Sequence, residues 1–440
     1  MKRTIGGLPL PPSLRVTLVA MSAIEAPIEA LLAYAEAKRV VVHEAVSVKH
    51  SPEEGFGLFT DKPLEKGELV IRLPLSSTLS LAKDLPPSLA PLLSSLEPRL
   101  ALAVLLCLTR GIEDWIANWP VQPQGSWGLC HTPGWENLVS WNRELAHRHA
   151  ESTASVHEAF HTTIRPFLTA TDDLGDINYQ RYLWAVSMVD SRAARVHLYG
   201  EERLVLMPLV DLLNHRSEPS CSLAFEPMLG DSGELVVRLK HTVDADEQLT
   251  ISYGDKANDE LIAQYGFALL HAPHECAVVL LPLVGDSSLV MQKASLLPPG
   301  TTFVNDAGEI RACVSFGWCL TSSAETDSLA LNAPQLTPEV WLVLRIAGAT
   351  DMMEVFEALS CAGDKDCSTR SGWQSLLQAC EEQLASISKA SETNGSPGTS
   401  SGETPMHAST ISATAAHART ELLNATIRAA NTALHAEHCR

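Results

Sequence analysis

The segment DEQLTISYGDKANDELIAQYGF, Asp246–Phe267, joins a short apolar run to the beginning of a helix. Its alternating apolar residues predict a strand over Gln248–Tyr253. The glycine after Tyr253 ends that strand, and Asn258 begins a helical stretch. A tyrosine at a strand end is either a core aromatic or a side chain that faces a cavity. This segment by itself leaves both interpretations open.

A second segment, LVDLLNHRSEPSC at Leu209–Cys221, places polar side chains after an apolar run. The run Leu204–Val210 predicts a strand, and Asn214 and His215 follow it directly. Side chains at the end of a strand can meet a ligand. An Asn-His pair is equally typical of a turn with an exposed histidine, so the pair alone does not distinguish a site from a turn.

A third segment, EEGFGLFTDKPLEKGE, carries two glycines on either side of Phe56. Closely spaced glycines let a backbone approach a ligand without obstruction by Cβ. The turn at Asp61–Gly67 and the apolar run Leu69–Leu73 predict a following strand. The third glycine of a dinucleotide-binding loop is missing.

Composition narrows the class of protein. The chain has 440 residues, 45% of them hydrophobic, and this length favours two or three domains. Lys and Arg number 32 against 52 Asp and Glu, a net charge of −20, which argues against nucleic acid as a partner.

The longest apolar runs, such as Ala277–Val284, are far shorter than the roughly 20 residues that cross a bilayer, so no membrane partner is expected. Ten cysteines without C-x-x-C pairs indicate a reducing compartment, with neither a zinc site nor a disulfide framework.

The three segments, together with YLWAVSMVDSR at residues 182–192, occur in an order and spacing that resembles the SET-domain protein methyltransferases. The likeness is narrower to the branch that includes the Rubisco large-subunit lysine methyltransferase and an actin histidine methyltransferase. It is strong over about residues 37–267 and weaker beyond. The resemblance implies an α+β fold: a β-rich SET domain with a knot-like core and a helical insertion, followed by a mostly α-helical C-terminal domain.

The resemblance implies S-adenosyl-L-methionine as the cofactor. The backbone at Glu54–Phe56 would lie against it, and Arg192 would grip its carboxylate. Asp211 would orient the Asn-His segment, and Tyr265 would pack beside the adenosine. The implied cofactor-binding residues are Glu54, Gly55, Phe56, Arg192, Asp211, Asn214, His215, Tyr253 and Tyr265.

The resemblance also implies the catalytic residue, Tyr253, whose hydroxyl would bond to the accepting amine. No metal is required, and the crowded histidines at His271–Cys276 are interpreted as a loop. Lysine-modifying relatives commonly have an aromatic residue two positions after the arginine, whereas this chain has Ala194, so the shape of the acceptor pocket stays open.

The expected domains follow from these patterns. They are a leader and helix at residues 1–36, a SET domain at 37–270 with a helical insertion at about 85–182, a helical substrate-binding-like domain at 271–385, a flexible linker at 386–412 and a C-terminal helix at 413–440. The first 22 residues carry Lys2, Arg3 and Arg15 but no acid, which is typical of a transit peptide or of a disordered leader. We expect a cytoplasmic or nuclear protein, with plastid targeting as the alternative.

The function expected from the sequence is transfer of a methyl group from S-adenosyl-L-methionine to a lysine of a protein substrate. The cysteine-rich segments that flank the SET core in many histone methyltransferases are missing, which favours a non-histone substrate. We expect a monomer. Two alternatives stay open: a protein-histidine methyltransferase, and a non-catalytic SET-fold binding protein that keeps the cofactor pocket.

Overall fold

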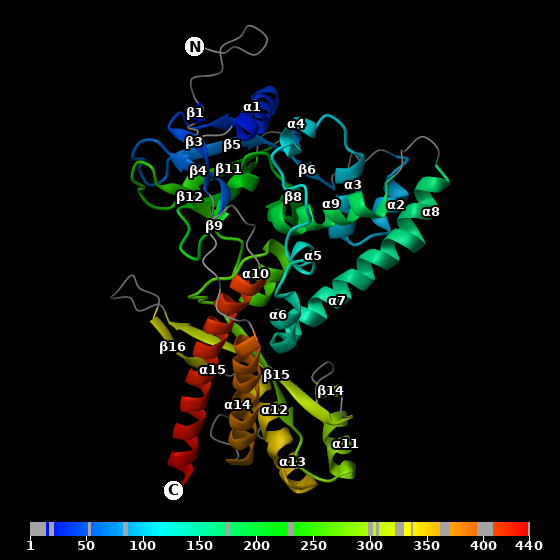
Figure 1. The fold of residues 1–440 in the computed structure, drawn as a ribbon, viewed down its shortest axis with the longest axis vertical. Coiled ribbons are helices and arrows are strands. Elements are labelled where there is room, and N and C mark those ends of the chain that lie inside the picture. The colour runs from blue at the N-terminus through cyan, green and yellow to red at the C-terminus, as the bar shows by residue number, and fades with distance from the viewer. Residues whose placement is uncertain are drawn as a thin grey trace. The chain divides into compact units, whose positions relative to one another are not determined.

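The computed structural model describes residues 15–16, 22–51, 54–81, 87–171, 177–227, 233–297, 302–304, 308–321, 330–335, 338–360, 370–393 and 408–438. The chain forms two compact units (Figure 1). The first comprises residues 1–128 and 149–255, and the second comprises residues 129–148 and 256–440. The division after residue 255 leaves Tyr253 in the first unit and Tyr265 in the second.

Three sheets of short strands form the centre of the first unit. One has the order β1, β3, β4, β12 and β9, which are Arg15–Val16, Val46–Ser51, Gly55–Thr60, Gln248–Ile251 and Asn214–His215. The next has the order β10, β11, β5 and β2, which are Cys221–Pro227, Gly233–Leu239, Leu69–Pro74 and Val41–Val42. The third has the order β6, β8 and β7, which are Leu79–Ser80, Glu201–Leu206 and Ala194–Leu198.

The pairing of β9 with β12 brings together two motifs that lie far apart in the sequence. The two strands are parallel, with Asn214 opposite Thr250 and His215 opposite Ile251 (Figure 1). On its other edge β12 pairs with β4 in the antiparallel sense. The glycine segment, the Asn-His segment and the tyrosine segment therefore lie on three neighbouring strands.

The predicted strand over Leu204–Val210 is wrong in its second half. β8 ends at Leu206, and the 3₁₀ turn η3 occupies Val210–Leu212 before β9 begins. Leu209 has a φ of 68°, a left-handed conformation that interrupts a strand. An apolar run looks the same in a buried strand and in a buried turn, because both hide every side chain. Leu209 is fully buried.

One helix of the first unit lies between β1 and β2, and its other helices lie between β6 and β7. They are α1 (Ser22–Ala37), α2 (Ala90–Ser94), α3 (Pro98–Leu108), α4 (Glu113–Ile116), α5 (Ser126–Leu129), α7 (Arg143–Glu158), α8 (Arg165–Thr169) and α9 (Tyr179–Arg192), with the short 3₁₀ turn η1 (Leu75–Ser77) and the π-helical turn η2 (Ala159–Ile164). The division between the units falls within α5 and α7. Asn178 caps α9 by accepting a hydrogen bond from the backbone N–H of Arg181 at 2.8 Å. Tyr182, Val186 and Val189 on this helix are buried in the core, and α9 packs against α3. The helix ends at Arg192, which is thereby placed next to η3.

The second unit combines helices with a sheet of four strands. The helices are α6 (Trp135–Trp141), α10 (Asn258–Tyr265), α11 (Ser287–Leu296), α12 (Pro338–Gly348), α13 (Met352–Ser360), α14 (Arg370–Thr393) and α15 (Ala408–His438). The strands are β13 (Cys276–Pro282), β14 (Thr302–Val304), β15 (Ile310–Thr321) and β16 (Ala330–Gln335), with β15 paired to the other three. The expected α+β class is confirmed, and the C-terminal region adds this sheet to its helices.

The flexible linker predicted over residues 386–412 is wrong at both of its ends. Residues 386–393 continue α14 and residues 408–412 begin α15, while residues 394–407 lie outside the described part of the chain. Ile387, Ala390 and Ile411 are buried in the core of the second unit. These apolar residues stand singly among Ser and Thr, so a helical apolar face was hidden by a linker-like composition. α15 packs against α14, so it belongs to this unit and is not a separate terminal helix.

Candidate active site

The close approach of three strands explains why a glycine lies at position 57. The Asn214 Nδ2 donates a hydrogen bond to the Phe56 carbonyl at 3.3 Å. A Cβ on Gly57 would lie 3.3 Å from that same Nδ2 and 2.6 Å from Gln248 Nε2. A side chain here would displace both amide groups, so glycine at position 57 lets the Asn214 and Gln248 side chains pack against β4.

Gly55 begins β4 beside the Asn-His segment, and Glu54 directly precedes it. Gly55 has a φ of 73°, which favours glycine. The Glu54 carboxylate accepts a hydrogen bond from Arg216 at 2.5 Å, and Arg216 also donates to the His215 carbonyl at 2.8 Å. Arg216 therefore ties the start of β4 to the end of β9.

Tyr253 lies against His215 at the end of β12. Its backbone N–H donates to His215 Nδ1 at 3.1 Å, and its hydroxyl donates to the Leu213 carbonyl at 2.9 Å. Burial raises the pKa of Tyr253 to about 12, although the charge of Arg192 acts in the opposite direction. The phenol therefore stays protonated at neutral pH.

Arg192 and Asp211 meet at the junction of α9 and η3, and each keeps a buried polar atom without a partner. An Arg192 guanidinium N–H donates to the backbone carbonyl of Asp211 at 3.1 Å, while Arg192 Nε has no hydrogen bond. Asp211 Oδ2 accepts from the indoles of Trp115 at 3.1 Å and Trp119 at 2.7 Å, while Oδ1 is unpaired. Burial lowers the pKa of Arg192 and raises that of Asp211. A cation with an unused buried donor can hold an anionic ligand.

A family model described as the SET domain matches residues 55–254, a range that contains β4, α9, β9 and Tyr253. Residues 55–254 are a SET domain. Over 250 residues, 52% of this chain and 55% of the relative, the sequence is 26% identical to SET domain-containing protein 4 of Homo sapiens. Over 247 residues it is 27% identical to the chloroplastic [fructose-bisphosphate aldolase]-lysine N-methyltransferase of Arabidopsis thaliana, covering 52% of this chain and 49% of that one. The chain spans about half the length of these curated relatives.

The fold is also that of a solved structure. The SET domain of LSMT, crystallised with lysine and AdoHcy, superposes with a TM-score of 0.66 and covers 92% of this chain and 91% of its own. The sequences are 16% identical, so this likeness establishes the fold alone.

Eight of the nine residues expected at the cofactor lie in the first unit, seven of them within the matched SET-domain range and Glu54 directly before it. Tyr265, the ninth, is the last residue of α10 in the second unit, where its ring lies 6.0 Å from that of Phe267. Its place beside adenosine remains a prediction.

Sequence patterns did not single out four residues that shape the SET domain site: Trp115, Trp119, Arg216 and Gln248. A signal existed for the two tryptophans, because they are four positions apart and both are buried. A buried indole N–H needs an acceptor, but no local pattern names Asp211 as that acceptor.

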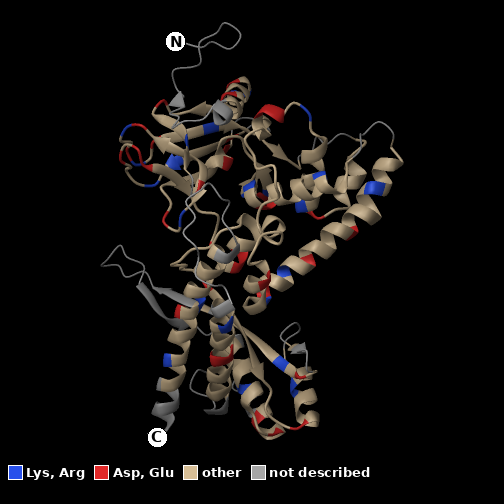
Figure 2. Ribbon diagram, in the orientation of Figure 1, with Lys and Arg blue, Asp and Glu red and all other residues tan. Residues whose placement is uncertain are grey.

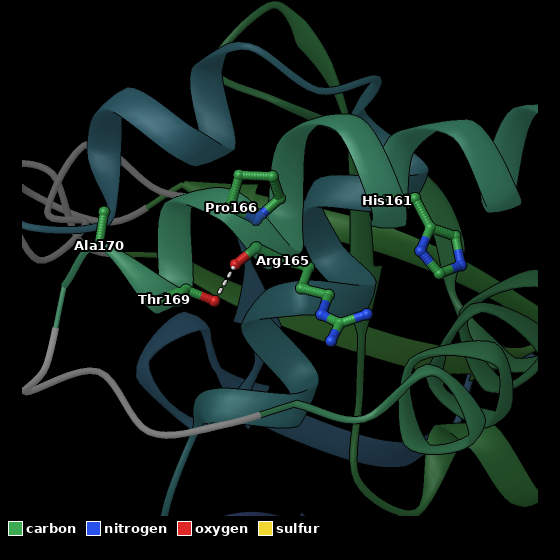
Figure 3. Close-up of a pocket in the computed structure, with 5 residues that line it drawn as sticks. All are labelled: His161, Arg165, Pro166, Thr169 and Ala170. Atoms are coloured by element: carbon green, nitrogen blue, oxygen red, sulfur yellow. Dashed lines mark hydrogen bonds between the residues drawn. The ribbon is translucent and has the colours of Figure 1, made fainter.

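An open depression of about 530 Å³ lies on η2 and α8 (Figure 3). It is lined by His161, Arg165, Pro166, Thr169 and Ala170, none of which is a predicted site residue. Among the described residues no group of three or more His, Cys, Asp or Glu is placed to hold a metal ion. None of the described helices has the length and apolar content to cross a membrane.

Proposed function

We propose that this chain is an S-adenosyl-L-methionine-dependent protein methyltransferase that methylates a lysine side-chain nitrogen of a non-histone protein. The observation that supports it most is the unused guanidinium donor of Arg192 at the end of α9. The names of the relatives agree with this reaction, because one of them is a lysine N-methyltransferase. The neighbours include Rubisco LSMT bound to AdoMet.

The residues present fit the cofactor. Arg192 Nε is buried and lacks a partner, which a carboxylate would supply. The backbone at Gly55 has no atom within 4 Å of where a Cβ would lie, and Asn214 is bonded to the neighbouring Phe56 carbonyl, so a ligand can approach the chain at Gly55. Asn214 and His215 would hold the methionine and adenine portions. When bound, the cofactor supplies a methyl group made electrophilic by a sulfonium.

Tyr253 orients the acceptor in this proposal. Its proton is directed at the Leu213 carbonyl, and its oxygen accepts a hydrogen bond from the substrate amine. With a pKa raised to about 12, the phenol is not a base at neutral pH. Before transfer the lysine ammonium would release its proton to solvent, because desolvation and the positive charge of the cofactor sulfonium would lower its pKa.

The substrate surface follows from charge. Asp and Glu outnumber Lys and Arg, and acidic residues are present on both units (Figure 2). This balance suits a basic, lysine-bearing protein segment as the partner. We assign substrate recognition to the second unit.

The reaction is tested by incubating the pure protein with methyl-labelled cofactor and a cell extract, followed by mass spectrometry of the labelled residue. Label on a lysine nitrogen supports the proposal. Label on an imidazole would establish the histidine reaction instead. A protein that binds the cofactor and labels nothing would be a SET-fold binding protein.

A further inference from the structure

The first unit contains two clusters in which tryptophan, aspartate and arginine meet, and they are built differently. The α9 cluster consists of Arg99, Trp127 and Asp190. The η3 cluster consists of Trp115, Trp119, Arg192 and Asp211. Both place a carboxylate, a guanidinium and an indole together in the interior.

In the α9 cluster the guanidinium hydrogen-bonds directly to the carboxylate. Arg99 Nη1 donates to Asp190 Oδ2 at 3.1 Å and to Oδ1 at 3.3 Å. The Trp127 indole donates to the same carboxylate at 3.4 Å. The charge of Asp190 is therefore neutralised directly by the arginine.

The η3 cluster has the same chemical groups, but its guanidinium and carboxylate do not hydrogen-bond to each other. Two indoles occupy Asp211 Oδ2, and the arginine donates to the backbone carbonyl of Asp211 instead of to the carboxylate. Arg192 Nε and Asp211 Oδ1 both stay unpaired and buried. Rotation of the carboxylate toward the guanidinium would satisfy both atoms, so something must hold the carboxylate in place.

Trp115 and Trp119 hold the Asp211 carboxylate in place. Trp119 makes the shorter bond, 2.7 Å, and the Arg192 guanidinium carbon lies 5.3 Å from the centre of its ring. Trp115 and Trp119 are 0% and 5% exposed, so neither indole can exchange Asp211 for water. Both belong to the helical insertion around α4, more than 90 residues before Asp211.

We propose that Trp119, assisted by Trp115, is a positioning residue that holds the Asp211 carboxylate away from Arg192, so that the guanidinium stays available to the carboxylate of the cofactor. The inference rests on the proposed function, because it assigns a ligand carboxylate to Arg192. It makes the insertion a part of the cofactor site through hydrogen bonds to one side chain.

The test compares two ligands on Trp119→Phe, which keeps an aromatic ring beside Arg192 and removes the indole N–H. S-adenosylhomocysteine carries the amino-acid carboxylate, and 5′-methylthioadenosine lacks it. By calorimetry, Trp119→Phe should weaken S-adenosylhomocysteine about tenfold, the effect of one charge-assisted hydrogen bond, and should leave 5′-methylthioadenosine within about twofold. Trp115→Phe, which removes the longer bond, should show the same selectivity with a smaller effect.

A second substitution separates positioning from packing. Adding Asp211→Asn to Trp119→Phe removes the carboxylate that would otherwise pair with Arg192. The double variant should therefore regain most of the S-adenosylhomocysteine affinity. The matched control is Trp127→Phe, which removes an indole bond to the already paired Asp190 and should leave both affinities unchanged.

The outcomes distinguish the inference from the proposed function. Equal weakening of both ligands in Trp119→Phe, or no weakening of either, would overturn the positioning role while leaving the cofactor assignment intact. A folded wild-type protein that binds neither ligand would overturn the proposed function itself.

Discussion

Each unit buries an arginine beside carboxylates, but the two arginines differ in how fully their hydrogen bonds are satisfied. In the second unit, Arg419 Nε donates to Glu275 at 2.8 Å, and its Nη2 donates to both oxygens of Asp259 at 3.0 and 2.9 Å. In the first unit, Arg192 makes one bond to a backbone carbonyl and leaves Nε unpaired. A completed buried network stabilises a fold, whereas an incomplete one is the type of site that a ligand completes.

Removal of Arg419 should have the largest effect on stability. Arg419→Met leaves Asp259 and Glu275 as buried carboxylates without their cation, and should lower the free energy of unfolding by about 3–5 kcal/mol. Urea unfolding followed by tryptophan fluorescence measures it. Arg311→Met is the control, because Arg311 pairs at 2.7 Å with a Glu382 that is 44% exposed, and it should cost no more than about 1 kcal/mol. Equal losses would show that burial is not the reason.

Removal of the Tyr253 hydroxyl should affect chemistry and spare the fold. Tyr253→Phe keeps the ring, and turnover should fall about 10²–10³-fold, the scale for losing one positioned hydrogen-bonding group at a reacting centre. Affinity for S-adenosylhomocysteine should stay nearly constant. Tyr199→Phe is the control, since that ring is 47% exposed and packs on Phe225. Product mass spectrometry identifies the competing result, in which a wider channel raises the number of methyl groups added. Wild-type rates with unchanged products would remove Tyr253 from the reaction.

Removal of Arg192 should weaken cofactor binding more than it lowers the stability of the fold. Arg192→Ala should weaken S-adenosylhomocysteine by about 1.5–3 kcal/mol, because a charge-assisted bond is lost. The thermal midpoint should fall less than in Arg419→Met, since Arg192 loses one hydrogen bond to a backbone carbonyl and none to a carboxylate. Arg99→Ala should do the reverse, because it breaks the ion pair with Asp190 and leaves the cofactor site intact. Calorimetry and thermal unfolding on both variants check this, and an unchanged affinity in Arg192→Ala would make that arginine structural.

The last expected change is in the dependence of stability on pH. Burial raises the pKa of Asp211 above its ordinary value of 3.8, so the folded state holds this proton at a pH where the unfolded chain has released it. The resulting stabilisation is complete below pH 3.8 and is lost as pH rises toward the folded pKa. Asp211→Asn removes this dependence. Its stability relative to wild type should therefore increase as pH rises from 3.8 toward the folded pKa. Urea unfolding across that range measures it, and parallel curves would contradict it.

Much of the SET domain was predictable because its motifs are local. Gly55-Phe56-Gly57, Asn214-His215 and the strand that precedes Tyr253 are each set by residues within a few positions of one another. Their order along the chain was enough to indicate the family and the α+β class. Boundaries were less predictable: the apolar run predicts a strand to Val210, but β8 ends at Leu206, before the left-handed backbone at Leu209.

Only the tertiary structure decided which charged and polar groups meet. Trp119 is 92 positions from Asp211, and Arg419 is 160 positions from Asp259, so no periodicity or spacing relates them. The helix that carries Arg419 begins in a stretch whose composition is typical of a linker. A local pattern indicates the type of element and which of its faces is buried, and the sequence by itself determines both. The partner of a buried charge depends on which distant segment packs against it, and that depends on the packing of the whole unit.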